Sequence, residues 1–299
     1  MPENNSERGS IAILALWGVA LIFMLIAPVA FATRGELQIA RNAFAVSRAR
    51  HAAEAGTQLG IVRLLRRRDA GTTAFDGTPE GWRLGTTTVA IAISDESGKI
   101  DLNAAPQEIL AGLFAGAGAP REAAELIACN VLDRRGDTGT MCPETDEPHP
   151  ARRFSVTEEL AEIPGIGEQL YDRLADSVTV ATGASAIDPL VAPRAVLMAI
   201  PGATDSMVDD FLDARASVHD LASAGAGLVP AAAMQYVVTS PRRDFTIAAT
   251  ATTADGARYR AELLVRLTEQ SAHPYQIMGW RTPPADPGAN VRPPRRRAP

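Results

Sequence analysis

The chain is poor in the residue types that build most catalytic and metal sites. It has only two cysteines and four histidines among 299 residues, and the cysteines have no histidine nearby at the spacing of a zinc site. None of the histidines has a nucleophilic side chain or a carboxylate at the sequence spacing of a known catalytic motif. The sequence also lacks a phosphate-binding glycine loop and a Ser-His-Asp arrangement. We therefore predict that the protein is not an enzyme, although an enzyme whose site is assembled from distant segments stays an open alternative.

Basic charge and aromatic side chains are also scarce, which disfavours nucleic acid as the main partner. The formal net charge is −6 and aromatic residues make up 5% of the chain, whereas a protein that neutralises phosphates needs an excess of lysine and arginine. Apolar residues reach 46%, which is enough for a folded core outside any membrane segment.

No charged residue occurs between Ser10 and Thr33, and a helix of this length can cross a bilayer. A secretory signal peptide would have a longer basic start and an apolar core of only ~7–15 residues. The run therefore predicts a membrane-anchored, exported protein. More arginines follow the run than precede it, so counting charges alone places the N-terminus outside.

The anchor is predicted to continue as one helix from Ser10 to about Arg68, because its second half lacks proline and carries apolar side chains at helical spacing. Such a helix is about 88 Å long at ~1.5 Å per residue, and Pro28 should bend it. Its second half is expected to pack on a folded domain. There, Arg50 and Glu54 have the spacing of an i,i+4 ion pair.

Strand patterns flank a helical block. Val89, Ile91 and Ile93 alternate with small residues, and alternation returns from Met234 onward around an Asp-Gly turn. The long stretch between is helical and punctuated by proline and glycine, with two related segments that suggest a duplicated module. The layout predicts an α+β protein in which an all-α insertion interrupts the strands.

Residues 163–167 (IPGIG) have the signature of a helix-hairpin-helix motif. In DNA-binding proteins this hairpin presents backbone N–H groups and a helix N-terminus to a phosphate. Here residues 154–177 carry six acidic residues and one basic residue, and a degenerate copy at 199–203 is also followed by acidic residues. Phosphate contact in such a field is costly, so we interpret the hairpin as a tight packing of two helices.

Cys129 and Cys142 bracket an acidic loop and form a candidate disulfide, worth ~3 kcal/mol in an oxidising compartment. Asp133, Asp137 and Glu144 in this loop are weak candidates for a calcium site, because calcium takes ~6–8 oxygen ligands. The loop lacks the spacing of an EF-hand, and a solvated acidic loop is an equal alternative. No cofactor other than this calcium ion is predicted.

Several segments taken together resemble the type II secretion system protein K family, the large minor pseudopilins. One is Gly9 followed by Ser10 and an apolar helix, and a second is RARHAAEAG at the end of the stem helix. A third is DESGKIDLNAAPQEIL, and the last is FSVTEELAEIPGIGEQLYDRLADSVTV followed by IDPLVAPRAVLMAIPG. The resemblance covers nearly the whole length up to Trp280.

The resemblance implies a pilin-like fold, in which a long N-terminal helix packs on an antiparallel sheet interrupted by two SAM-like, helix-hairpin-helix modules. It implies that a prepilin peptidase cuts between Gly9 and Ser10 and methylates the new amine. It also implies a single-pass inner-membrane protein with a periplasmic C-terminal domain, which reverses the orientation from charge counting. The implied partners are other minor pseudopilins, the peptidase and the membrane, and no nucleic acid.

Leu14 stands at mature position five counted from Ser10. Most pilins have a glutamate there, which pairs with the N-terminal amine of a neighbouring subunit. Because a leucine does not neutralise a buried ammonium group, the resemblance implies a subunit at the tip of the pseudopilus that contributes to filament initiation and protein export.

The predicted domains are a leader, a membrane span, a stem with the first strands, two helical modules, the last strands and a disordered tail. Their boundaries are 1–9, 10–33, 34–102, 103–182, 183–232, 233–281 and 282–299. The alternative hypothesis is a membrane-anchored helix-hairpin-helix protein that binds DNA in the manner of competence receptors.

Overall fold

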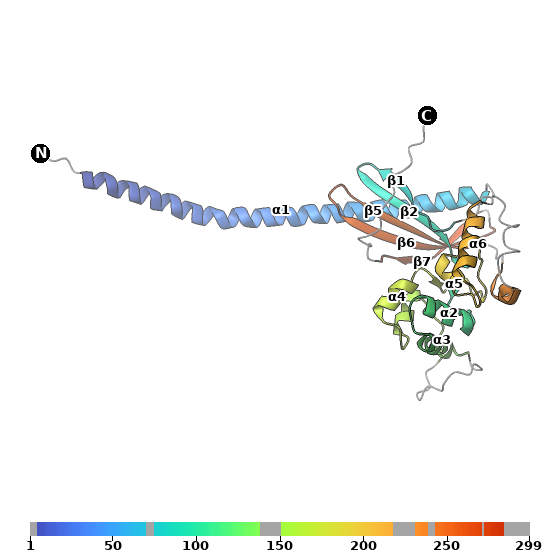
Figure 1. Ribbon diagram of the computed structural model, residues 1–299. Coiled ribbons are helices and arrows are strands. Elements are labelled where there is room, and N and C mark those ends of the chain that lie inside the picture. The colour runs from blue at the N-terminus through green and yellow to red at the C-terminus, as the bar shows by residue number, and fades with distance from the viewer. Residues whose placement is uncertain are drawn as a thin grey trace.

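A computed structural model describes residues 5–69, 75–137, 151–217, 231–238, 243–270 and 272–283. One long helix, α1 (Asn5–Asp69), projects from a folded body, and Figure 1 shows its C-terminal part lying along a β-sheet. The shorter helices gather on the other side of the sheet in this view. The prediction of one continuous helix from the anchor into the stem is confirmed.

The sheet has five antiparallel strands in the order β1-β2-β5-β6-β7. Its central pair joins β2 to β5, so strands from the two sides of the helical block lie next to each other. The predicted α+β class, with a helical insertion that interrupts the strands, is therefore confirmed. The insertion is not wholly helical, because it also contains a short two-stranded pair. The strands span β1 Glu80–Leu84, β2 Thr87–Asp95, β5 Asp244–Thr252, β6 Arg258–Leu267 and β7 Tyr275–Arg281.

Two details of the strand prediction need correction. β1 was not anticipated, because a five-residue edge strand with charged residues shows no alternation of burial. The strand pattern also does not begin at Met234, which lies in a 3₁₀ helix, η3 (Ala231–Tyr236), ahead of β5. The predicted Asp-Gly turn joins β5 to β6 as expected, with Gly256 at a φ of 82°.

Helix α1 packs on the sheet through small residues. Ala49 and Ala53 are fully buried, and Gly56 and Gly60 lie directly over β2 and β5. A Cβ atom on Gly56 would come within 2.7 Å of Val89 Cγ1. Such a close helix–sheet approach leaves no space for a side chain at this position, and it fixes where the helix crosses the sheet.

The helical insertion has its own hydrophobic core. Its first part also contributes a short parallel pair, β3 with β4. Phe114, Leu110 and Leu160 are among its fully buried side chains. The elements are β3 Ile100–Asp101, α2 Gln107–Gly116, α3 Arg121–Arg135, η2 Thr157–Glu162, α4 Glu168–Leu174, β4 Val178–Thr179, α5 Arg194–Met198 and α6 Asp205–Ser217.

A buried ion pair marks the junction between sheet and insertion. After β2, the 3₁₀ helix η1 (Glu96–Gly98) is capped by Asp95, whose side chain accepts a hydrogen bond from the Ser97 N–H. Lys99 Nζ lies 2.6 Å from Glu96 Oε1, and the Glu96 side chain is 4% exposed. Burial by itself raises the pKa of Glu96, but the Lys99 charge and hydrogen bonds from neighbouring side chains outweigh it, so this pKa lies below its ordinary value.

Candidate assembly surface and the cavity beneath the sheet

The part of α1 that precedes the sheet exposes large apolar side chains. Between residues 36 and 48 only Ala45 is buried, whereas Leu37, Ile39, Phe44 and Val46 are 49–72% exposed. Exposed apolar residues that gather on one element mark interaction sites more often than they mark free surface. This segment, the free stem, is the candidate assembly surface.

Apolar exposure continues toward the N-terminus of α1. The described side chains of residues 15–24 include Trp17, which is 65% exposed, and Phe23, which is 70% exposed. Within the part of the chain that the structure describes, no helix meets the length and hydropathy needed to cross a membrane. The predicted span at 10–33 lies partly outside the described side chains, as do Gly9, Ser10 and Leu14.

Where α1 reaches the sheet, its polar face carries the predicted ion pair. Arg50 Nε donates to Glu54 Oε1 over 2.8 Å, and His51 Nδ1 lies 3.3 Å from Glu54 Oε2. The hydrogen bond from Arg50 is the main reason that the pKa of Glu54 lies below its ordinary value. Arg48 approaches Asp255 in the β5–β6 turn to within 3.9 Å. These contacts are solvent-exposed, so they contribute little to stability.

The cysteine and calcium predictions concern the segment after α3. Cys129 on α3 is disulfide-bonded, whereas Cys142 and Glu144 lie outside the described residues. Asp137 binds Arg135, with 2.7 Å between Asp137 Oδ2 and Arg135 Nε. Among the described residues, no group of three or more His, Cys, Asp or Glu side chains is arranged to hold a metal ion. Asp133 and Asp137 therefore do not form such a group with their described neighbours.

The helix-hairpin-helix segment packs inward. Ile163 and Ile166 are buried, and Gly165 has a φ of 95°. A Cβ atom at Gly165 would come within 2.8 Å of the Ile127 side chain on α3. The hairpin backbone therefore lies against α3, as expected for a motif that packs helices. The stretch that precedes it is a 3₁₀ helix, η2, instead of the α-helix expected from the motif.

Internal arginines bind several of the acidic side chains around this hairpin. Arg134 places its two terminal nitrogens 2.8 Å from Glu159 and 3.0 Å from Glu162. On the second hairpin copy, Arg194 reaches Asp205 over 2.7 Å and Asp209 over 3.0 Å. These carboxylates thus bind arginines within the insertion. In the hairpin segment itself, acidic residues still outnumber basic ones.

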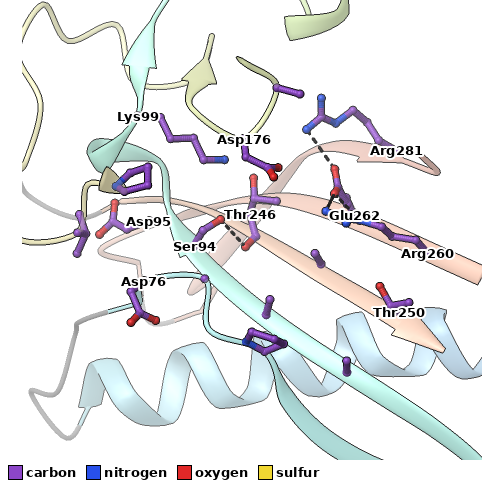
Figure 2. A pocket seen from close by; sticks show the side chains of 18 residues that line it. Asp76, Ser94, Asp95, Lys99, Asp176, Thr246, Thr250, Arg260, Glu262 and Arg281 are labelled. Atoms are coloured by element: carbon purple, nitrogen blue, oxygen red, sulfur yellow. Dashed lines mark hydrogen bonds and ion pairs between the residues drawn. The ribbon is translucent and has the colours of Figure 1, made fainter. Parts of the chain in front are cut away.

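A cavity of about 360 Å³ lies between the insertion and the sheet face opposite α1. Figure 2 shows Lys99 and Asp176 pointing in from the insertion, and Thr246 and Thr250 lying on the sheet below. Small side chains, Ala90 among them, line it at the sheet. Neither cysteine nor histidine is among its described lining residues.

Arg281 holds the far wall of this cavity together. Its guanidinium donates to Thr157 Oγ1 over 2.7 Å and to Glu158 Oε1 over 2.8 Å. It also lies 3.2 Å from Glu262, which accepts a 2.9 Å hydrogen bond from Arg260 Nε. β7 is thereby tied to η2 of the insertion. This role of Arg281 was not predictable from the sequence, because Arg281 adjoins the arginine-rich tail and its partners lie far away in the chain.

Comparison with known proteins identifies the fold. No protein-family model and no curated protein sequence matches the chain. Among solved structures, the chain is similar to GspK in the GspK-GspI-GspJ complex of the enterotoxigenic Escherichia coli type 2 secretion system, with a TM-score of 0.52 and 15% sequence identity. The match covers 85% of this chain and 99% of that one. The chain has a GspK-like fold.

The GspK-like fold confirms the resemblance inferred from the sequence motifs, and it includes the insertion as well as the helix and sheet. An identity of 15% leaves few side chains in common. The functional assignment therefore depends on the surfaces that this chain itself presents, above all the free stem.

Proposed function

We propose that the protein is a minor pseudopilin of a type II secretion system, located at the tip of the pseudopilus. In this role it contributes to filament initiation and to export of proteins across the outer membrane. The observation that carries the proposal is the free stem in combination with the GspK-like fold. A soluble monomer does not benefit from a helix that exposes Phe44 and Ile39 beyond its folded body.

The proposed anchoring follows from the uncharged run that begins at Ser10. The leader is cleaved after Gly9 by a prepilin peptidase, the first part of α1 lies in the inner membrane, and the folded body lies in the periplasm. Helices of other minor pseudopilins cover the free stem. GspK was solved in complex with GspI and GspJ, which supports partners of this class.

The tip position is proposed from Leu14. A pseudopilin with glutamate at this position pairs with the amine of its neighbour, whereas a leucine leaves that amine unpaired and therefore disfavours a subunit above. The insertion adds bulk to the end of the molecule away from the projecting helix (Figure 1). A subunit of this shape ends a filament more readily than it extends one.

The experiment is co-purification of the tagged full-length chain with the other minor pseudopilins of its own secretion system. Phe44→Glu places a charge in the proposed helix interface, and we expect it to lower the retained partners at least about tenfold, which corresponds to ~1.4 kcal/mol. Gln58→Glu adds the same charge at an exposed position of α1 over the sheet and serves as the matched control. Equal retention by both variants would contradict the proposal.

A further inference from the structure

The two edges of the sheet differ in how they meet solvent. β1 carries Glu80 and Arg83, and Arg63 and Arg67 of α1 both bind Glu80. β7 has no charged residue from Tyr275 to Trp280. Natural proteins protect exposed sheet edges with charges and shortness. β1 is protected in this way, and β7 is not.

Apolar side chains line the unprotected edge. Ile277, Met278 and Trp280 are 50%, 44% and 44% exposed. In the register with β6, Ile277 pairs with Val265 and Trp280 pairs with Leu263, whose side chains are buried against α1. Ile277 and Trp280 therefore extend the apolar α1 face of the sheet beyond the area that the helix covers.

The outer edge of β7 is suited to pairing with an added strand. Among the described strands β7 pairs only with β6. Within the described residues, its other side therefore has no strand partner, and an added strand would pair with the N–H and C=O groups there. Arg281 binds Thr157 and Glu158 at the end of β7. The edge is thereby held in place before a partner arrives, which reduces the entropy lost on binding.

A hollow adjoins β7 on the face opposite α1. Its volume is about 160 Å³, and Val156, Met278 and Trp280 are among its lining residues. Met278 is the extra residue of a β-bulge, because Gly279 pairs with Leu264 and Ile277 pairs with the next residue, Val265. A strand beside β7 would place every second side chain toward this hollow.

We propose that β7 is a docking edge for an extended segment of a neighbouring minor pseudopilin, which adds a sixth strand and inserts an apolar side chain into the hollow. This inference rests on the proposed function. We infer a partner's segment as the occupant, because residues 284–299 of the chain itself include five prolines and proline cannot donate to a ladder. The partner segment has apolar residues at alternate positions and no charge facing Trp280.

The test uses the tagged full-length chain, co-expressed with the other minor pseudopilins of its secretion system. Ile277→Lys adds the charge that protects natural edges, and Trp280→Ala removes the largest exposed side chain. We expect each to lower the retained partner at least about tenfold. Trp82→Ala is the matched control, because Trp82 is 39% exposed on the opposite edge strand. Near-UV circular dichroism establishes that the variants keep the native fold.

Each outcome decides the matter. Loss with Ile277→Lys and Trp280→Ala, combined with native retention by Trp82→Ala, supports the docking edge. If the native chain retains partners and Ile277→Lys retains them equally, the docking edge is wrong while the proposed function stands. The docking edge is also wrong if Trp82→Ala lowers partner retention as much as Ile277→Lys does. It is equally wrong if the native chain self-associates and Ile277→Lys abolishes that self-association. If the native chain retains no partner, the proposed function fails and this inference fails with it.

Discussion

The contact between α1 and the sheet should be intolerant of side chains at Gly60. A Cβ atom there would overlap Cγ2 of Ile247 and lie 3.4 Å from Cγ2 of Ile91. Both isoleucines are at most 1% exposed, so neither has space to move away. Gly60→Ala gains about 1 kcal/mol of helix propensity, but overpacking a dense core costs about 1–3 kcal/mol. We expect a net loss of about 1 kcal/mol for alanine and more than about 3 kcal/mol for leucine.

The assay is urea unfolding of the full-length chain in detergent, followed by near-UV circular dichroism. Gly116→Ala is the matched control, because Gly116 ends α2 with nothing within 4 Å of an added Cβ. That substitution should be neutral or stabilise by up to about 1 kcal/mol. If Gly60→Leu unfolds at the same urea concentration as the native chain, the close approach of α1 to β5 is refuted.

Three further predictions concern the junction and the disulfide. Lys99→Met leaves Glu96 buried without its cation and should destabilise the fold by about 3–5 kcal/mol. Because the pKa of Glu96 is lowered on folding, its ionisation stabilises the native state above its ordinary pKa of 4.5, and this contribution is lost as the pH falls through the lowered value. Glu96→Gln should therefore flatten the acid limb of a plot of unfolding free energy against pH, and an unchanged limb would contradict this. Cys129→Ser should cost ~3 kcal/mol in urea unfolding if Cys129 pairs with Cys142, whereas an unchanged midpoint would argue against that pairing.

Periodicity and turn residues were sufficient to predict the layout. The helical spacing through residue 68 predicted α1, the alternation around Ile91 predicted β2, and the Asp-Gly turn predicted the β5–β6 hairpin. These signals are local, because each depends on residues within one element. The same local spacing predicted the Arg50–Glu54 pair, which the structure confirms.

Features that depend on distant segments were not predictable. Gly60 stands in a helical pattern, and only the position of Ile247 on β5 explains why it has no side chain. Glu96 stands in a polar stretch of the sequence, yet it is only 3% exposed in the folded chain. Arg281 binds a residue 123 positions earlier. In each case the cause is a tertiary contact that has no signature in the neighbouring sequence.

The exposure of the free stem was not predictable for a different reason. Phe44 and Leu37 fit an amphipathic helix that packs on a domain, but the sheet ends before it reaches them. Only the structure shows where helix coverage stops, and therefore which apolar residues remain for a partner.

The central claim is that an apolar helix, freed of a short polar prefix, anchors the folded body to the membrane. The most direct test is the mass and N-terminal sequence of the chain isolated from its native host. The account predicts a polypeptide that begins at Ser10 with a methylated amine, in the Leu14→Glu variant as well, and an uncleaved chain in the Gly9→Val variant. A native chain that still begins at Met1 while the secretion system functions would contradict it.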